Sequence, residues 1–293
     1  MRDWPGAGER VDEAVRAEPS RPLRGMIAAY DGYRQRGVEP AHHLGLPSPF
    51  LTVIFTLHEP LNIVRHVDRE RPAARYDALI GGLHAEPVLI AHEGEQSGIQ
   101  LRVSPLAARA LFGVPAGELG SLDMAAEELL GADAERIRER LLAAEDWPQR
   151  FAVLDRSLCA RASDAPEPPR ALAAAWRLLL QSAGSVPVSV IAREVGWSER
   201  QLGNRFREEI GLSPKTAARV VRFHRARHAL QRQLAEDGGA DIARTAAGCG
   251  YYDQSHMIRD FHSFAGIAPS HWLREEFRNV QARTSSDDLV SSL

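Results

Sequence analysis

The chain has 293 residues, of which 44% are hydrophobic and 26% are charged, and its formal net charge is -3 at pH 7. This length allows two domains, and 23 glycines with 18 prolines exclude a collagen-like or wholly disordered chain. No apolar run approaches the ~18 residues that a membrane helix needs. The first twenty residues carry charges throughout, so we expect no signal peptide and a cytoplasmic location.

The chain is expected to begin with β-structure. Phe50–Leu57 carries β-branched and aromatic residues and is bounded by prolines, which is typical of a buried strand. Leu61–Val67, Pro87–His92 and Ile99–Val103 are further strand candidates, separated by polar turns that contain glycine.

Helices are expected to follow between Leu106 and Arg161. Gly113 and Gly131 stand where the C-caps of two of these helices belong. A β-rich region followed by helices predicts an α+β domain at residues 1–161, built as a small β-barrel or sandwich plus helices.

A polar, proline-rich segment at residues 162–170 is expected to be a linker. Beyond it, apolar residues recur at helical spacing in residues 172–179 and again in Ala217–Leu234. We therefore predict an all-α domain at residues 171–279, followed by a disordered tail at 280–293.

The two halves of the chain differ in charge. Residues 1–169 contain 19 arginines against 26 acidic residues, a net charge of -7. Residues 170–280 contain 16 basic against 11 acidic residues, a net charge of +5. A basic segment beside an acidic one points to a polyanionic partner for the basic segment.

The basic segment contains an internal repeat. One copy has Gly196-Trp197 before Ser198, the other has Gly250-Tyr251 before Asp253, and both end in Phe-x4-Gly-x2-Pro. The offset between the copies is 54 residues before the turn and 55 after it. In each copy the glycine permits a sharp turn with positive φ, and the Ser or Asp caps the next helix. Each copy is therefore predicted to be a helix-turn-helix unit.

The second helix of each unit is expected to bury one face and to leave the other free. Arg, Asn, Gln and Ser on the free face are the donors and acceptors that read base edges in the major groove. The candidate DNA-reading residues are Arg200, Gly203, Asn204 and Arg207 in the first unit and Gln254, Ser255, His256 and Arg259 in the second.

The stretch GCGYYDQSHMIRDFHSFAGIAPSHWLR closely resembles the signature of the AraC/XylS family of transcription regulators. The matching residues are Gly250, Tyr251, Asp253, Ser255, Arg259, Phe261, Gly266 and Pro269. Ala268 stands where the family has Ser or Thr, and Leu273 where Arg is common. The first unit matches more loosely, since Asn204 followed by Arg205 stands where the family commonly has Arg.

The resemblance covers residues 171–279 and implies a sequence-specific, double-stranded DNA-binding transcription regulator with no catalytic residue and no cofactor. It also implies that the helix around Ala217–Leu234 joins the two units and places them in successive major grooves. The stretch LPSPFLTVIFTL is weakly similar to sensor domains that are fused to this module. Candidate partners besides DNA are a small-molecule effector, RNA polymerase and a second copy of the chain, but no membrane.

Three alternatives stay open at this point: a metal-dependent barrel enzyme, a DNA-alkyl acceptor, and an N-terminal domain that makes only protein contacts. The histidines of the acidic half lack the H-x-H or H-E-x-x-H spacing of a metal site. They are His42, His43, His58, His66, His84 and His92. Neither Cys159 nor Cys249 has a metal-ligand spacing or a flanking base, and no nucleophile elbow is present, so we expect no metal site and no enzyme.

Overall fold

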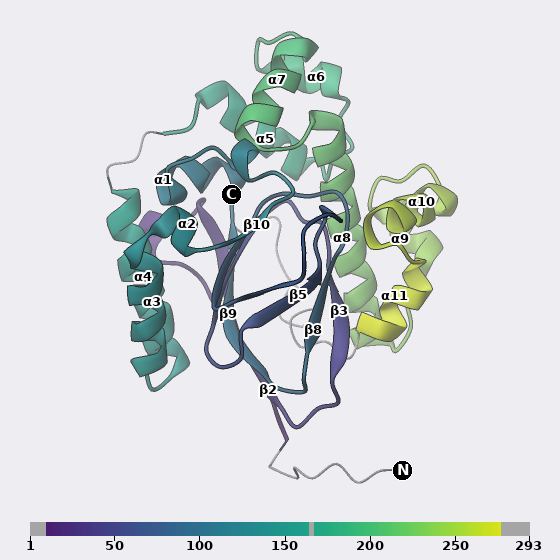
Figure 1. Ribbon diagram of the computed structural model, residues 1–293. Helices are drawn as coiled ribbons and strands as arrows, with labels where there is room; N and C mark the ends of the chain where they lie inside the picture. Colours follow the sequence, from purple (N-terminus) through teal and green to yellow (C-terminus); the bar gives the residue numbers. More distant parts are fainter. Residues whose placement is uncertain (1–9, 164–166, 277–293) are drawn as a thin grey trace.

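The computed structural model describes residues 10–163 and 167–276. Figure 1 shows a β-rich N-terminal part with helices along one side and the helical C-terminal part along another. This order confirms the predicted fold class, an α+β part followed by an all-α part with two helix-turn-helix units. No helix within the described ranges combines the length and apolar character that crossing a bilayer requires.

Two antiparallel sheets form the β-rich part. The larger sheet has the strand order β1-β2-β9-β4-β7-β10 and the smaller one the order β3-β8-β5-β6. The strands are β1 (Val11–Ala17), β2 (Ile27–Arg36), β3 (Ala41–Gly45), β4 (Leu51–Thr56), β5 (Leu61–Arg65), β6 (Ala74–Tyr76), β7 (Ala78–Gly81), β8 (Val88–His92), β9 (Gln96–Val103) and β10 (Asp123–Ala125).

One apolar cluster joins the two sheets. Ile54 of β4 and Leu79 of β7 from the larger sheet meet Ile63 of β5 and Ile90 of β8 from the smaller one. Each of these side chains is at least nine-tenths buried. The sheets therefore pack face to face, since removing apolar surface from water stabilises such a pair by ~25 cal/mol per Å².

Four helices follow β9 in the N-terminal part: α1 (Ala108–Phe112), α2 (Glu127–Leu130), α3 (Ala132–Ala143) and α4 (Trp147–Ala162). Tyr30 of β2 stacks on Phe151 of α4 with ring centroids 5.9 Å apart, and its hydroxyl donates to Asp155 at 2.8 Å. Gly32 of β2 allows the Trp147 ring of α4 to approach the strand closely, because a β-carbon at this position would stand 2.6 Å from that ring. The larger sheet thus buries one face against α4.

The C-terminal part contains seven helices among its described residues. They are α5 (Arg170–Gln181), α6 (Val188–Glu194), α7 (Glu199–Glu209), α8 (Pro214–Asp237), α9 (Ile242–Gly248), α10 (Gln254–Ala265) and α11 (Pro269–Glu276). The long helix α8 runs between the α5–α7 group and the α9–α11 group (Figure 1). Val220, Phe223, Ala226 and Leu230 of α8 are fully buried, as their helical spacing predicted.

The two parts of the chain are in direct contact. Arg109 of α1 donates two hydrogen bonds of 2.9 Å to the carboxylate of Glu209 at the end of α7. Gly117, in the 3-10 turn Ala116–Leu119, lies against the same end of α7 so closely that a β-carbon would overlap backbone oxygens there. Phe50 packs edge-on against His224 of α8, with ring centroids 6.0 Å apart.

The expected strands were located correctly but were incomplete. Those expected at Phe50–Leu57, Leu61–Val67, Pro87–His92 and Ile99–Val103 are confirmed as β4, β5, β8 and β9. The other strands were missed. The linker expected at 162–170 overlaps the last residue of α4 and the first residue of α5, and 164–166 lie outside the described residues. Its role as a domain boundary stays a prediction. The tail expected at 280–293 lies outside the described residues.

Candidate nucleic-acid interface

The first helix-turn-helix unit consists of α6 and α7. Gly196 turns the chain between them with a φ of 73°, a conformation that residues with a side chain rarely adopt. Ser198 then caps α7, accepting a hydrogen bond of 3.1 Å from the backbone N–H of Gln201. Leu202 and Phe206 are fully buried, so one face of α7 is fixed against the core.

The second unit repeats this construction in α9 and α10. Gly250 has a φ of 77°, and the Asp253 carboxylate accepts a hydrogen bond of 2.7 Å from the His256 backbone N–H. Met257 and Phe261 are fully buried at the positions equivalent to the buried pair of α7. The repeat in the sequence therefore corresponds to two capped helices, each anchored by one apolar face.

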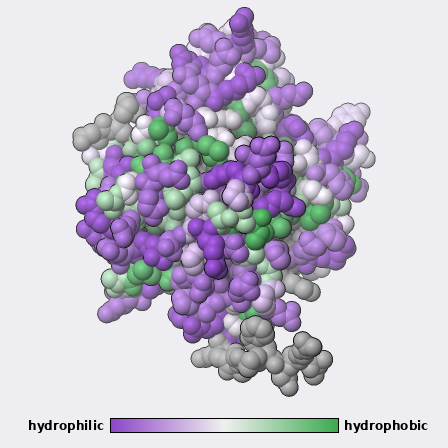
Figure 2. Space-filling view, viewed as in Figure 1, coloured by the Kyte–Doolittle hydropathy of each residue, from purple (hydrophilic) through white to green (hydrophobic). Residues whose placement is uncertain are grey.

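Most of the predicted DNA-reading residues lie on the free faces of α7 and α10. The exposed ones are Arg200, Asn204 and Arg207 on α7 and Gln254, Ser255 and Arg259 on α10. His256 is half-buried and its ring packs edge-on against Tyr251, while Gly203 lies on the buried side of α7. Figure 2 shows a mainly hydrophilic surface at the end of the molecule that carries α6 and α7.

Two arginines of α8 have structural partners. Arg219 donates to Asp260, which is 2% exposed, at 2.8 and 3.0 Å, and its guanidinium lies 4.8 Å from the Phe264 ring centroid. Arg222 donates to the carbonyl oxygen of Gly184 at 2.7 Å and lies over the Tyr251 ring. Asp260 is therefore neutralised by α8, and the neighbouring Arg259 keeps its exposed position on α10.

A cavity of about 880 Å³ separates the smaller sheet from α10 and α11. Its sheet side carries His42, His43 and Leu44 of β3, Arg65 of β5, Arg69, the segment Ala85–Pro87, and Leu89 and His92 of β8. Its helical side carries Ser263, Ala265, Gly266, Ile267, Trp272 and Glu275. The cavity thus joins the N-terminal part to the end of the second candidate recognition helix.

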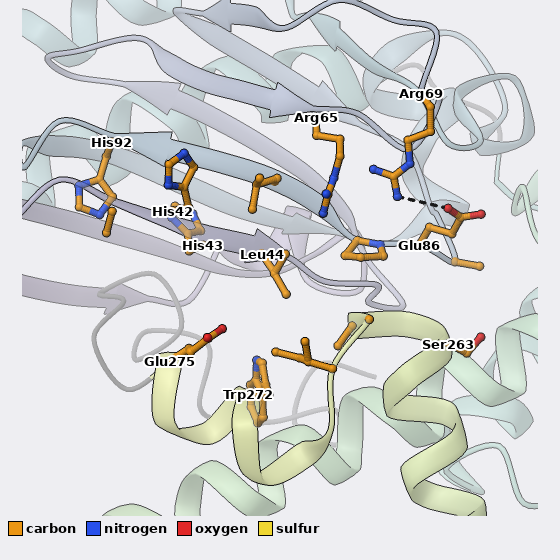
Figure 3. A pocket seen from close by; sticks show the side chains of 17 residues that line it. His42, His43, Leu44, Arg65, Arg69, Glu86, His92, Ser263, Trp272 and Glu275 are labelled. Carbon is orange, nitrogen blue, oxygen red and sulfur yellow. Dashed lines mark ion pairs between the residues drawn. The ribbon is translucent and has the colours of Figure 1, made fainter.

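Polar groups from both sides face this cavity (Figure 3). Arg65 extends from β5 toward the helices, whereas Arg69 is paired with Glu86 at 3.6 Å. Burial lowers the pKa of His92, which keeps that imidazole neutral at pH 7. Trp272 is 1% exposed, and its indole N–H has no acceptor among the described residues. A buried donor without an acceptor is destabilising, so this N–H favours a ligand that supplies one.

The histidines and cysteines of the chain take other roles. His66 is buried and pairs with Asp123 at 3.0 Å, and His58 lies 3.2 Å from Glu95. No three potential metal ligands come together within residues 10–163 and 167–276. Burial raises the pKa of the Cys249 thiol, which disfavours the thiolate that an alkyl acceptor would use.

Residues 191–275 match a family of helix-turn-helix domains, a range that begins in α6 and ends in α11. This match confirms the helix-turn-helix domain that the repeat predicted in the C-terminal part of the chain. No curated protein sequence matches the chain.

Three solved structures are similar to this chain, and the first of them shares its fold. An apo variant of ToxT from Vibrio cholerae has a TM-score of 0.51 at 12% identity, over 85% of this chain and 97% of that one. ToxT from the same organism with a bound unsaturated fatty acid has a TM-score of 0.48 at 11% identity, over 88% and 97%. An AraC-type regulator from Chromobacterium violaceum has a TM-score of 0.32 at 24% identity, over 37% and 93%.

Proposed function

We propose that this chain, an AraC-family DNA-binding transcription regulator, reads its operator with the exposed faces of α7 and α10. One observation carries the proposal: the two capped helices present exposed polar side chains while their opposite faces are fixed in the core. Half-sites in successive major grooves are ~34 Å apart, and α8 supplies a continuous connection between the two units. The residues assigned to base reading are Arg200, Asn204 and Arg207 of α7 and Gln254, Ser255 and Arg259 of α10, with Gly203 and His256 as closer-packed neighbours.

Single alanine substitutions test this assignment on a duplex that the full-length chain selects from a randomised pool. Arg259→Ala and Asn204→Ala are each expected to weaken binding by ~1–3 kcal/mol and to relax base preference at one position. Arg136→Ala is the matched control, because Arg136 is exposed on α3 far along the chain from both units. A loss that is equal on every sequence would assign Arg259 to a phosphate, and no loss would contradict the assignment.

The cavity between the smaller sheet and α10–α11 is proposed as the effector site of the regulator. A ligand there would contact both the N-terminal part and the end of α10, so its binding free energy would depend on how the two parts are arranged. Leu44, Leu89 and Ile267 offer apolar surface, while Arg65 and the indole N–H of Trp272 offer a cation and a donor. These groups favour an amphipathic molecule with an anionic acceptor such as a carboxylate.

A panel of straight-chain carboxylates and the alcohols of the same lengths tests the effector site. A ligand at a hundredfold excess over its Kd stabilises the protein by ~2.7 kcal/mol, which raises the melting temperature. We expect the carboxylates to act more strongly than the alcohols, and we expect Arg65→Gln to remove that difference. Equal effects of acids and alcohols would contradict the role of Arg65, and no shift with any compound would favour a domain that makes only protein contacts. Contacts with RNA polymerase and with a second copy of the chain remain predictions.

A further inference from the structure

Tyr252 is the most exposed large hydrophobic side chain among the described residues. It is 93% exposed, whereas Leu142 and Leu122, the other two of this kind, are 46% and 36% exposed. Large aromatic side chains normally bury most of their surface, so this ring contributes almost nothing to the folded core. It directly precedes Asp253, the residue that caps α10.

The turn around Tyr252 is held firmly on both sides. Before it, Tyr251 is 5% exposed, and the Arg222 guanidinium lies 5.4 Å from its ring centroid. After it, the Asp253 carboxylate accepts the hydrogen bond from the His256 backbone N–H. With the backbone fixed by its neighbours, the Tyr252 ring projects into solvent from a rigid position.

The repeat shows that Tyr252 is an additional residue. In the first unit the cap Ser198 follows Gly196 after one residue, whereas in the second unit Asp253 follows Gly250 after two. This difference explains why the offset between the copies changes from 54 to 55 residues at the turn. Since Tyr251 already packs against the core at the position that Trp197 holds in the first unit, and Tyr252 is 93% exposed, the extra residue has no role in the core.

We propose that Tyr252 is a DNA contact of the second unit, in which its ring packs against an apolar group at the wall of the groove. In a helix-turn-helix the N-terminal end of the recognition helix approaches the bases, and Tyr252 stands at that end of α10. The apolar groups available there are the thymine methyl in the major groove and the deoxyribose along its edge. A tyrosine on a rigid turn can bury its ring with little loss of conformational entropy. The proposal rests on the proposed reading of DNA by α10.

The experiment compares Tyr252→Ala, Tyr252→Phe and Arg259→Ala in the full-length chain, on a duplex selected by the unmodified protein. Tyr252→Ala is expected to weaken binding about 10-fold, the factor that corresponds to ~1.4 kcal/mol, without lowering the melting temperature. Tyr252→Phe is expected to bind within about twofold of the unmodified chain, because the contact uses the ring. Leu142→Ala, a substitution of an exposed apolar residue on α3, is the matched control and should leave binding unchanged.

Replacing thymines one at a time by uracil, which lacks the methyl group, identifies the apolar group. If uracil at one position weakens binding of the unmodified chain but leaves binding of the Tyr252→Ala variant unchanged, the ring contacts the methyl group of that thymine. A loss in Tyr252→Ala that no uracil position reproduces assigns it to deoxyribose. If Tyr252→Phe binds as weakly as Tyr252→Ala, the hydroxyl makes the contact and the proposal is overturned. The proposal is also overturned if the Tyr252→Ala variant binds normally while the Arg259→Ala variant does not. If both variants bind normally, the result contradicts the proposed reading of DNA by α10.

Discussion

Acidification should weaken the contact between the two parts of the chain at a pair of histidines on α8. His224 is 3% exposed, and its ring lies between Phe50 of the N-terminal part, at 6.0 Å, and His228, at 4.2 Å between ring centroids. Neither ring nitrogen of His228 has a hydrogen-bond partner among the described residues. The Arg227 guanidinium lies 3.3 Å from Nδ1 of His224.

The surroundings of this pair disfavour the imidazolium form. Burial, and then the neighbouring charges, lower the pKa of both His224 and His228 well below its ordinary value. The charged groups that face the pair are Arg227 and Arg232 of α8, Arg102 of β9 and Arg16 of β1. The nearby carboxylate of Asp31 is already engaged by Arg16 at 2.8 Å and Arg102 at 3.1 Å. Both imidazoles are therefore neutral in the folded protein at pH 7.

The sign and size of the effect follow from proton linkage. The unfolded chain binds protons at His224 and His228 with a pKa near 6.5, whereas the folded chain does not, so stability falls as the pH drops below 6.5. Between pH 7 and pH 5 each histidine that stays neutral in the folded protein removes ~1.9 kcal/mol of unfolding free energy. For the pair we expect ~2–4 kcal/mol, because His228 is only partly buried.

Urea denaturation of the full-length chain at pH 7 and pH 5 measures this loss. Protonation of carboxylates contributes equally in all variants, so the difference between variants isolates the histidines. His228→Gln should remove about half of the pair's contribution, since it leaves one imidazole to be protonated. His58→Gln is the control, because His58 is half-exposed beside Glu95. The reasoning is refuted if the His228→Gln variant loses as much unfolding free energy between pH 7 and pH 5 as the His58→Gln variant and the unmodified chain do.

Two further substitutions test how the helical part is held. Gly117→Ala places a β-carbon on the backbone oxygens of α7, so we expect a loss of ~2 kcal/mol in thermal unfolding, whereas Gly239→Ala, which meets open space, should be close to neutral. Arg219→Ala leaves the buried Asp260 carboxylate without its ion pair and should destabilise the chain by ~3 kcal/mol, unlike Arg259→Ala on the exposed face. Equal melting temperatures within either pair would contradict the corresponding contact.

The sequence predicted those strands whose own residues form a local pattern typical of a buried strand. β4 and β8 are largely apolar runs, while β5 and the second half of β9 place apolar residues at alternate positions, and either pattern between turn residues predicts a strand. β1, with the sequence VDEAVRA, has adjacent charged residues that break the alternation of a half-buried strand, and β2 contains Asp31 and Gly32 at buried positions. The buried Asp31 carboxylate is neutralised by two arginines, and Gly32 leaves the space that the Trp147 ring occupies. All of these partners are distant from β2 in the sequence. Local pattern could not supply these partners.

The candidate site also has parts that the local sequence predicted and parts that it did not. The turns at Gly196 and Gly250 and their caps were predicted because a helix-turn-helix is specified within some twenty adjacent residues. The cavity was not predicted, since β3 and α11 meet there only after the whole chain has folded. The spacing of His42 and His92 predicted no metal site, and nothing in it pointed to the cavity that both line in the structure. Trp272 gave no signal, because its unpaired N–H exists only in three dimensions.

The last prediction concerns the helical C-terminal part expressed without the N-terminal part. Residues 167–276 contain their own aromatic core, in which Phe223 lies 4.9 Å from Phe261, so this fragment is expected to fold and to bind DNA. Removing the N-terminal part takes away Phe50 and Arg102, exposes the two histidines of α8 and returns their pKa toward the ordinary value. The fragment should therefore lose less unfolding free energy between pH 7 and pH 5 than the full-length chain does. An equal loss would place the cause in the arginines of α8 itself, and the contact between the two parts would then not be the acid-sensitive element.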